Sequence, residues 1–376
     1  MKFNCDRATF AALTQKAAKI APRNHPIEIL VGILVEADME RQEIFLTTTD
    51  MATSVMLKMK ATISEGGKTV IAADLLSKIS VSWDNERIFF QSHNDSAIGI
   101  SNGTEKSRFN ILTKPAKYFK VPAMPFPEET VKIKGICTLA KKTTYAASKD
   151  ETNPVLSCVN LRLATSGTTI SASNRANMVV QKINLTAEDE MEFLIPASTL
   201  ELLAAISTDE MVYEIGSVDD SIVFTGSDIV FSARSVKGKF IDCDRVIKAI
   251  EQQYAAVVDA KSFARELDSI KVFSPNARFS MILTESEVLL EYNDNNGYFK
   301  SQVKAKTIAP TGPKGFHYPI AQVLNFVKRA DGLIKIVMDK QGFMLMVTKE
   351  GTIIFVSPMV EKKNKETSEK TKKSAA

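Results

Sequence analysis

Hydrophobic and polar positions follow the same order three times along the chain. The segment 69–79 (TVIAADLLSKI) begins as a short apolar strand and continues with apolar residues at helical spacing. The segments 193–203 (FLIPASTLELL) and 316–326 (FHYPIAQVLNF) repeat this pattern about 124 and 123 residues further on. A repeat of this length is a whole domain and not a solenoid unit. Three such copies suggest a pseudo-symmetric body, of a kind that tends to close into a ring.

Each copy also starts with a strand followed by a helix. In the first copy Asp6 is a good N-cap residue, four apolar residues then recur at helical spacing, and Pro22 ends the helix. The predicted strand and helix pairs are 2–5 with 6–20, 131–134 with 136–148, and 255–258 with 261–273.

Between these helices the apolar pattern changes to a period of two residues, which is typical of strands. The predicted strands are 29–35, 43–49, 155–161, 168–172, 278–284 and 287–292. Each copy therefore has two helices, about 65 residues apart, on one side of an antiparallel sheet. The expected fold class is α+β, with three pseudo-repeated layered domains.

Composition changes mark the domain boundaries. The proline-rich stretch 122–127 separates the first copy from the second, and the stretch 242–253 joins the second to the third. The predicted domains are 1–122, 126–246 and 250–360. The remaining stretch, 361–376, holds six Lys and three Glu with few apolar residues, which predicts a disordered tail.

The net charge of +4 comes mostly from this tail, which supplies +3 and leaves the body near +1. A body this close to neutral is not a generally basic nucleic-acid binder, so contact with DNA requires basic residues gathered on one surface. The four Cys are far apart, the start lacks an apolar signal sequence, and no apolar run is long enough for a membrane helix. A cytoplasmic protein is expected.

No catalytic chemistry stands out. His25, His93 and His317 are isolated from one another, and the sequence has neither a G-x-x-x-x-G-K-[ST] phosphate loop nor a G-x-S-x-G elbow. An enzyme on a repeated α+β scaffold is therefore disfavoured, and neither a metal nor another cofactor is expected.

Several segments, in order and over nearly the whole body, resemble the bacterial sliding clamps, the beta subunits of DNA polymerase III. No single segment is specific, but their order, spacing and threefold repetition are. They are 1–3 (MKF), 22–30 (PRNHPIEIL), 47–50 (TTTD), 107–112 (SRFNIL), 115–119 (PAKYF), 145–156 (YAASKDETNPVL), 193–197 (FLIPA), 238–242 (GKFID), 245–247 (RVI) and 354–359 (IFVSPM).

The resemblance implies a non-catalytic processivity factor of DNA replication. Such a protein is a head-to-tail homodimer, a ring of six similar domains around duplex DNA, with helices lining the hole and sheets outside. It tethers the polymerase and other enzymes and raises their effective concentration at the template. The expected partners are double-stranded DNA without sequence preference, a second copy of the chain, and the polymerase catalytic subunit and clamp loader through short linear peptides.

Basic residues on the predicted inner helices and their loops are the candidates for DNA contact, because a sliding ring should touch phosphates without reading bases. The alternative is that they are ordinary solvated helix faces. They are Lys16, Lys19, Arg23, Lys78, Lys141, Lys142, Lys149, Arg265, Lys271, Lys328 and Arg329.

The resemblance also places a hydrophobic cleft for partner peptides between the second and third domains. Simple core packing is the alternative for its apolar members. Carried over position by position, the cleft residues are Leu156, Ser173, Arg175, Ala176, Asn177, Met178, Ile241, Arg245, Val246, Phe355, Pro358 and Met359.

This cleft departs from the family pattern. The segment 172–178 reads ASNRANM where the family has ATDGxRL, Ile241 stands for a proline and Cys243 for an aromatic residue. The chain also continues beyond Met359 into the Lys-rich tail. Altered partner peptides are therefore expected, as in a divergent paralogue or a phage-borne clamp.

The resemblance assigns the dimer interface to the first domain of one chain and the third domain of the other, with Phe109 and Ile111 facing Val272 and Phe273. The leading interpretation is thus a DNA sliding clamp. The alternative is a clamp-fold interaction scaffold that no longer encircles DNA, and lumen charge and dimer contacts separate the two.

Overall fold

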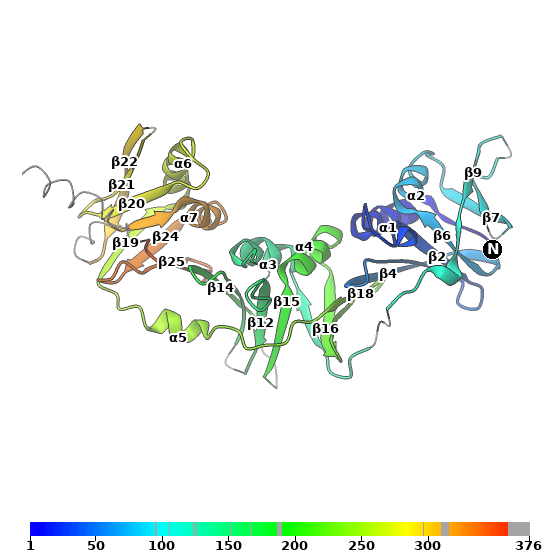
Figure 1. Ribbon diagram of the computed structural model, residues 1–376, viewed down its shortest axis with the longest axis horizontal. Helices are drawn as coiled ribbons and strands as arrows, with labels where there is room; N and C mark the ends of the chain where they lie inside the picture. Colours follow the sequence, from blue (N-terminus) through cyan, green and yellow to red (C-terminus); the bar gives the residue numbers. More distant parts are fainter. Residues whose placement is uncertain are drawn as a thin grey trace, which may run out of the picture. The chain divides into compact units, whose positions relative to one another are not determined.

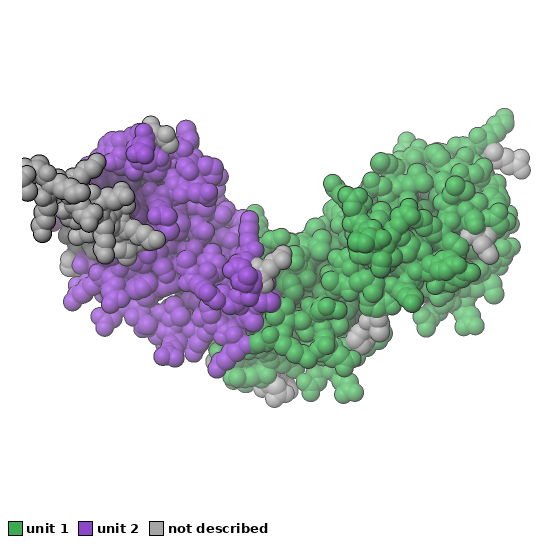
Figure 2. Space-filling view, in the orientation of Figure 1, with its two compact units in different colours: residues 1–144, 161–166, 185–238 green, residues 145–160, 167–184, 239–376 purple. Residues whose placement is uncertain are grey.

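The structure, a computed structural model, describes residues 1–359 apart from 95, 105, 123, 125, 151, 166, 186–189, 296 and 310–315. The predicted tail, 361–376, lies outside these residues. The chain forms two compact units, coloured in Figure 2. Unit 1 comprises 1–144, 161–166 and 185–238, and unit 2 comprises 145–160, 167–184 and 239–376.

Unit 1 holds four α-helices, which are α1 (Arg7–Ile20), α2 (Ala73–Ser80), α3 (Ile136–Thr143) and α4 (Ala197–Ile206). Its strands are β1 (Lys2–Asp6), β2 (Gly32–Asp38), β3 (Glu43–Thr49), β4 (Thr53–Lys60), β5 (Thr62–Glu65), β6 (Gly67–Ala72), β7 (Arg87–Asn94), β8 (Ala97–Ser101), β9 (Arg108–Leu112), β10 (Lys114–Pro115), β11 (Val131–Lys134), β15 (Met191–Pro196), β16 (Val212–Val218), β17 (Ser221–Thr225) and β18 (Ile229–Arg234).

Unit 2 contains the helices α5 (Cys243–Lys248), α6 (Ala260–Lys271) and α7 (Ile320–Val327). Its strands are β13 (Thr168–Ser173), β14 (Asn177–Ile183), β19 (Tyr254–Asp259), β20 (Arg278–Leu283), β21 (Glu287–Asp294), β22 (Gly297–Thr307), β23 (His317–Pro319), β24 (Leu333–Met338), β25 (Met344–Thr348) and β26 (Ile353–Val356). Strand β12 (Cys158–Leu163) contributes its first half to unit 2 and its second half to unit 1.

The helices pack in pairs, α1 with α2, α3 with α4, and α6 with α7 (Figure 1). Each pair contains one helix from the start of a sequence repeat and one from its middle, so the threefold repeat of the sequence is also a threefold repeat of structure. Helix α1 packs in addition against strands β3 and β4 and against α4. These observations confirm an α+β fold with three sheet-and-helix repeats.

Sheet pairing joins successive repeats through their edge strands. In unit 1, β4 of the first repeat pairs antiparallel with β18 of the second, which produces the order β10-β6-β2-β3-β4-β18-β17-β16-β11. In unit 2, β14 of the second repeat pairs with β26 of the third in the same way. The compact units therefore follow the continuous sheets and cut through the middle repeat. The predicted domain boundaries stay a prediction.

The first helix shows how sequence sets local structure. The Oδ1 atom of Asp6 accepts a hydrogen bond from the backbone N–H of Thr9 at 2.7 Å, as a predicted N-cap should. Hydrogen bonding to the Thr9 side chain, and then to its backbone N–H, lowers the pKa of the Asp6 carboxyl. The buried Phe10 ring lies 5.0 Å from the ring of Phe90 on β7. In the same core the Thr14 hydroxyl donates to Ser80 Oγ of α2 at 2.9 Å. Helix, partner helix and sheet thus meet at one buried face.

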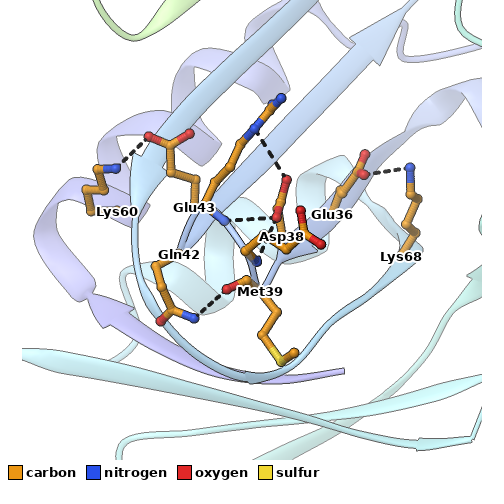
Figure 3. A network of polar contacts seen from close by, with 9 residues as sticks. Glu36, Asp38, Met39, Gln42, Glu43, Lys60 and Lys68 are labelled. Carbon is orange, nitrogen blue, oxygen red and sulfur yellow. Dashed lines mark hydrogen bonds and ion pairs between the residues drawn. The ribbon is translucent and has the colours of Figure 1, made fainter.

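The β2–β3 hairpin shows how charges on the strands are neutralised (Figure 3). Glu36 pairs with Lys68 at 2.5 Å, and Glu43 pairs with Lys60 at 3.0 Å, each on a neighbouring strand. At the turn, Asp38 Oδ1 accepts backbone N–H bonds from residues 40 and 41 at 3.0 and 3.1 Å. The carboxylates of this hairpin therefore have nearby hydrogen-bond donors or cations.

Four predicted elements differ from the structure, and one of them is the strand expected at 155–161, which begins at Cys158. Residues Glu28–Val31 form a 3-10 helix before β2, so the strand expected at 29–35 starts later. The helix expected over 136–148 ends at Thr143 and is followed by a 3-10 turn. The stretch expected to be a plain connection, 242–253, contains α5, capped by Asp242 Oδ1 accepting from Arg245 N at 3.0 Å. Among the described residues no helix is long and apolar enough to cross a membrane.

The buried ring of Phe10 provides a test of this core. Phe10→Ala should reduce the free energy of unfolding by about 3–5 kcal/mol, because it removes a fully buried aromatic side chain and leaves a cavity. Urea denaturation followed by circular dichroism measures the change. The control is Phe89→Ala at the neighbouring, 36% exposed position of β7. An equal loss in both variants would show that the α1 core does not have the stated role.

Candidate nucleic-acid and partner-binding surfaces

The candidate DNA-contacting residues lie mostly on the paired helices. Helices α1 and α3 together contain five basic residues and no acidic residue. The charged side-chain groups of six candidates form no hydrogen bond or ion pair with any described residue, in contrast to the lysines paired with the β2–β3 hairpin. These six are Lys16, Arg23, Lys78, Lys149, Arg265 and Lys271. Their side chains keep their charge available for an external anion.

Other candidates have partners inside the chain. Lys19 Nζ donates to the backbone oxygen of Ala205 at 3.0 Å, which ties α1 to the end of α4. Lys328 forms an ion pair with Asp268 at 2.8 Å. Lys141 and Lys142 lie in the last turn of α3, where cations interact favourably with the helix dipole.

Arg329 has a structural environment unlike that of the other candidates. Its guanidinium carbon lies 4.7 Å from the ring centroid of Tyr145, and its Nη1 donates to the backbone oxygen of Asn325 at 2.7 Å. Burial raises the pKa of the Tyr145 hydroxyl, so this ring stays neutral beneath the cation. Arg329 thus joins the end of α7 to the segment after α3, and contact with DNA would have to compete with that role.

The N-terminus of α3 is held by a residue from another segment. Gly135, at the cap position, has no side chain and a φ of 79°. Asp209, after α4, supplies the missing acceptors, because its Oδ1 takes the backbone N–H of Thr138 at 2.9 Å and its Oδ2 takes the Thr138 hydroxyl at 2.7 Å. These bonds lower the pKa of the Asp209 carboxyl. Asp209 therefore positions the helix that carries Lys141 and Lys142.

Three of the predicted cleft residues come together in unit 2. Met178 of β14, Phe355 of β26 and Val246 of α5 belong to one hydrophobic cluster. Met178 is only 2% exposed, because α5 packs over this face of the sheet. The remaining members of the cluster are Val180, Ala255, Val337, Leu345, Cys243, Ile247, Ile250, Ala309, Phe343 and Ile353.

The sequence did not lead us to predict that the α5 segment covers this cluster. Cys243, Ile247 and Ile250 project from the α5 segment, and the Phe343 ring stacks on Phe355 with centroids 5.7 Å apart. Burial raises the pKa of the Cys243 thiol to about 11, so it behaves as an apolar side chain here. The repeated apolar residues after Asp242 were a usable signal for a short amphipathic helix.

The other predicted cleft residues lie around this cluster or apart from it. Leu156 is buried in the turn before β12 and is not among the cluster members. Met359 is half-buried, and its backbone N–H donates to the oxygen of His317 at 2.8 Å. On the β13–β14 turn Ser173 and Asn177 are buried while Arg175 and Ala176 are exposed; Arg245 is exposed on α5, and Ile241 and Pro358 are half-buried.

The predicted dimer residues lie on one edge strand and one helix end. β9 is the last strand of its sheet, in the order β5-β1-β7-β8-β9. Phe109 is 39% exposed and its ring lies 5.1 Å from that of Trp83, whereas Ile111 is buried in its own chain. Leu112, which was not predicted, is 85% exposed at the end of the strand. It was missed because the expected alternation favoured its neighbour.

On the other side, Val272 follows α6 and is also 85% exposed. Phe273 is half-buried, with its ring 5.0 Å from that of Tyr292 on β21. Exposed apolar residues thus occur on both predicted surfaces, although Phe273 has a partner within the chain.

Comparison with known proteins identifies the fold and its relatives. Residues 1–125 match the family model for the DNA polymerase III beta subunit, N-terminal domain, and residues 130–242 match the model for its central domain. The chain is 24% identical over 302 residues to the beta sliding clamp of Micrococcus luteus, covering 77% of this chain and 94% of that protein. It is 22% identical over 298 residues to that of Bacillus subtilis, covering 75% and 77%.

Solved structures agree over a greater length. The beta subunit from the DNA polymerase of Streptococcus pyogenes superimposes with a TM-score of 0.87 at 17% identity, over 96% of this chain and all of that one. The Bacillus subtilis sliding clamp superimposes with a TM-score of 0.85 at 18% identity, over 96% and 99%. The α+β fold with three sheet domains is therefore confirmed over nearly the whole chain.

The Asp209 cap allows a test of how the α3 lysines are positioned. Asp209→Ala should lower the free energy of unfolding at pH 7 by about 1 kcal/mol, as loss of a helix cap does. Because the folded pKa of Asp209 is lowered, its contribution is complete above about pH 4 and is lost as the pH falls through the folded pKa. Urea unfolding measures the difference in the free energy of unfolding between Asp209→Ala and the unmodified chain. This difference should be smaller at pH 3 than at pH 7. Glu210→Ala is the control, and equal effects of the two variants would contradict the capping role.

Proposed function

The chain belongs to the DNA polymerase III beta subunit family, the beta sliding clamps, and from this membership we propose that it is a DNA sliding clamp that encircles duplex DNA as a head-to-tail homodimer. The family is that of a non-catalytic polymerase accessory subunit, which confirms the expectation that the chain is not an enzyme. Encirclement of DNA, the dimer and the polymerase partners belong to the proposal.

The observation that carries the proposal is a pair of free strand edges. The first repeat joins the second through β4 and β18, and the second joins the third through β14 and β26. In the third repeat, residues 297–304 of β22 hold the position that β4 and β14 hold in the first and second repeats. In the first repeat, β9 holds the position that β18 and β26 hold in the second and third. On the edge away from β21, residues 297–304 have no described partner, and β9 pairs only with β8. Such edges need a partner, and a second copy of the chain supplies both.

The internal junctions also predict the register of this contact. At the first junction Thr53 lies opposite Ala233, and at the second Asn177 lies opposite Val356. The turn geometry makes Gly297 the counterpart of Thr53, because Asn293 pairs with Tyr298 as Thr49 pairs with Ser54. Position 111 on β9 is the counterpart of Ala233.

Gly297 should therefore face Ile111 of the partner subunit, and Tyr298 should face the partner's Asn110. The neighbouring apolar side chains support this register. Leu112 and Val272 are the most exposed apolar residues at the two surfaces, each at 85%, and an interface would remove both from water.

The helix face supports the DNA part of the proposal. Six unpaired cations occur on or next to the helices α1, α2, α3 and α6, while carboxylates such as Glu36 and Glu43 are paired on the strands. Flexible Lys and Arg side chains without fixed partners suit weak, sequence-independent phosphate contact.

The Met178 cluster is the proposed site for partner peptides. It has the composition that such a site needs, but α5 packs over it. A peptide must therefore bind beside α5 or displace it. Of the family departures, Cys243 packs against this cluster, Ile241 precedes α5 by two residues, and Arg175 is exposed on the β13–β14 turn. We expect peptides unlike those of other clamps, with an acidic residue near Arg175.

The dimer register is tested by a cysteine pair. Tyr298→Cys combined with Asn110→Cys should form an intersubunit disulfide under mild oxidation, because facing Cβ atoms on paired strands lie about 4.5–5.5 Å apart. Non-reducing electrophoresis should show a covalent dimer of twice 41.4 kDa. The pair Tyr298→Cys with Arg108→Cys, two residues out of register, is the control.

A second variant tests the assembly itself. Val272→Arg should give a monomer by light scattering, since an exposed apolar contact becomes a buried cation without a partner. A folded Val272→Arg chain that stays dimeric, or cross-linking only in the shifted pair, would show that this interface is wrong. A monomer for the unmodified chain would favour the scaffold alternative.

The DNA contact is tested by charge reversal on α3. Lys141→Glu with Lys142→Glu should strongly reduce retention on closed circular DNA after loading, and unmodified protein should bind short linear duplex weakly and in a salt-dependent manner. Retention is measured by gel filtration of the DNA complex. Lys58→Glu with Lys349→Glu, an exposed lysine on β4 and one in the turn after β25, is the control. Tight binding of the unmodified protein to one short linear sequence would contradict sliding.

A further inference from the structure

The turns at the two internal junctions match in hydrogen bonding. The β3–β4 turn runs from Thr49 to Ser54, and the β13–β14 turn runs from Ser173 to Met178. The third residue of each has a left-handed backbone, with φ of 73° at Met51 and 75° at Arg175. In both turns the first hydroxyl donates to the oxygen four residues on at 2.9 Å, and it accepts the N–H two residues on at 3.0 and 3.2 Å.

The match extends to the second residue and to the neighbouring strand. Asp50 Oδ1 accepts two backbone N–H bonds at 3.0 and 2.6 Å, and Asn174 Oδ1 accepts the corresponding two at 3.2 and 2.8 Å. The N–H of Arg234 then donates to Ala52 O at 2.9 Å, as that of Ser357 donates to Ala176 O at 2.9 Å. The two junctions thus present the same backbone surface.

The first junction has an open cavity at this surface. Its volume is about 470 Å³, within the usual range of small-ligand and peptide pockets. The cavity lies wholly in unit 1. Its walls include Met51 and Ala52 of the turn, Arg234 at the end of β18, Lys237 after this strand, and Pro122 of the linker. At the second junction the matching positions of Met51 and Ala52 are Arg175 and Ala176, two of the predicted cleft residues.

The walls combine one unpaired cation with an apolar rim. Asp220, which also lines the cavity, forms an ion pair with Lys237 at 2.5 Å, and its pKa is lowered by Lys237 and to a smaller degree by the charge of Arg234. The exposed Arg234 guanidinium itself forms no hydrogen bond or ion pair with a described residue. Met51 is 44% exposed beside it. A carboxylate next to an apolar side chain complements this pair, since a guanidinium accepts a carboxylate with two parallel hydrogen bonds.

We propose that the cavity between the first and second repeats is a second peptide-binding groove, which takes an extended segment of a partner protein with an acidic residue beside an apolar one. The acidic side chain pairs with Arg234, and the apolar side chain packs on Met51, Ala52 and Pro122. The inference rests on the peptide-binding role proposed for the second junction, from which the matched turn is transferred. Each protomer then has two grooves of related backbone and different side-chain chemistry.

Two other occupants fit less well. The chain's own stretch 361–376 has an excess of Lys, so it carries the same charge as Arg234. Nucleic acid would use Arg234 but would leave the apolar rim of Met51 and Pro122 without a contact of its own. A partner segment of mixed acidic and apolar character uses both features.

The test follows the two grooves separately through methionine methyl groups. The full chain, labelled with ¹³C at the Met methyls, is titrated with capped hexapeptides that place one Asp beside Leu, Met or Phe in an Ala and Ser background. The Met51 signal, assigned with Met51→Leu, reports the first groove, and the Met178 signal, assigned with Met178→Leu, reports the second. The Met51 signal should shift with saturation, and peptides with Lys in place of Asp should bind at least about tenfold more weakly.

Arg234→Glu should weaken the Met51 response at least about tenfold and leave the Met178 response unchanged. If this variant does not fold, Arg234→Gln replaces it with the same expectation. The matched control is Lys58→Glu, which makes the same charge change on β4 outside the cavity. A Met51 signal that responds to none of the acidic peptides, or that responds equally in Arg234→Glu, overturns the proposal.

Two further outcomes distinguish this proposal from the peptide site proposed at Met178 and from binding of nucleic acid. A Met178 response alone overturns the proposed groove at Met51 and supports the one at Met178, while no response at either methyl removes the premise as well as the inference. A stronger Met51 response to a dT12 oligonucleotide than to any peptide would assign the cavity to nucleic acid and overturn the proposal. None of these readouts depends on dimer formation or on DNA encirclement.

Discussion

Backbone pairing at the edges of the sheets is the interaction on which the rest of this structure depends. An exposed strand edge presents unpaired N–H and C=O groups, and besides the other ends of its sheets each repeat here has two edges at the positions where repeats pair with one another. The chain covers four of them internally, β4 with β18 and β14 with β26. The two that remain, β9 and the first part of β22, are at opposite ends of the series of repeats. These two edges are the ones on which the proposed head-to-tail dimer depends.

The same pairing explains where surfaces for other molecules form. At each junction a tight turn with a left-handed residue, Met51 or Arg175, precedes the pairing strand, and the next repeat donates one backbone N–H to that turn. The connecting segment then determines what becomes of the surface beside the turn. At the second junction α5 covers the apolar residues around Met178, and at the first a cavity stays open beside Arg234. The same turn and backbone hydrogen bonds thus occur beside two chemically different surfaces.

Much of the fold could be predicted from the sequence because the signals were local. The N-cap at Asp6, the period-two strands and the threefold spacing each depend on a few neighbouring residues, and the structure confirms them. The elements that were wrong depend on more distant contacts. The 3-10 helix at Glu28–Val31 looks like a strand in its apolar pattern, and α5 is only six residues long. Its helical form is stabilised by the Met178 cluster beneath it, whose buried members come from β14, β19, β24, β25 and β26.

The candidate sites were predictable to the same degree. Residue type and helical position were enough to select Lys16, Lys78 and Lys271, but not to show that Lys328 is paired with Asp268 or that Arg329 lies over Tyr145. Those pairings join segments far apart in sequence, and no local pattern contains them. At the predicted dimer surface, the alternation of apolar residues led to the selection of Ile111. In the structure Ile111 is buried in its own chain and Leu112 is exposed.

The distribution of charge follows from this architecture rather than from net charge. Strands bring side chains of neighbouring strands within reach of one another, so Glu36 and Glu43 have a lysine directly across, and their charges cancel locally. Helix α1 presents Lys16 and Lys19 on one face with no acidic residue in the helix to pair with them. A body with a net charge near +1 can therefore keep a positive helix face, provided that its carboxylates are neutralised on the sheets. Weak attraction to a polyanion confined to one face, without general basicity, is what a ring that moves along DNA requires.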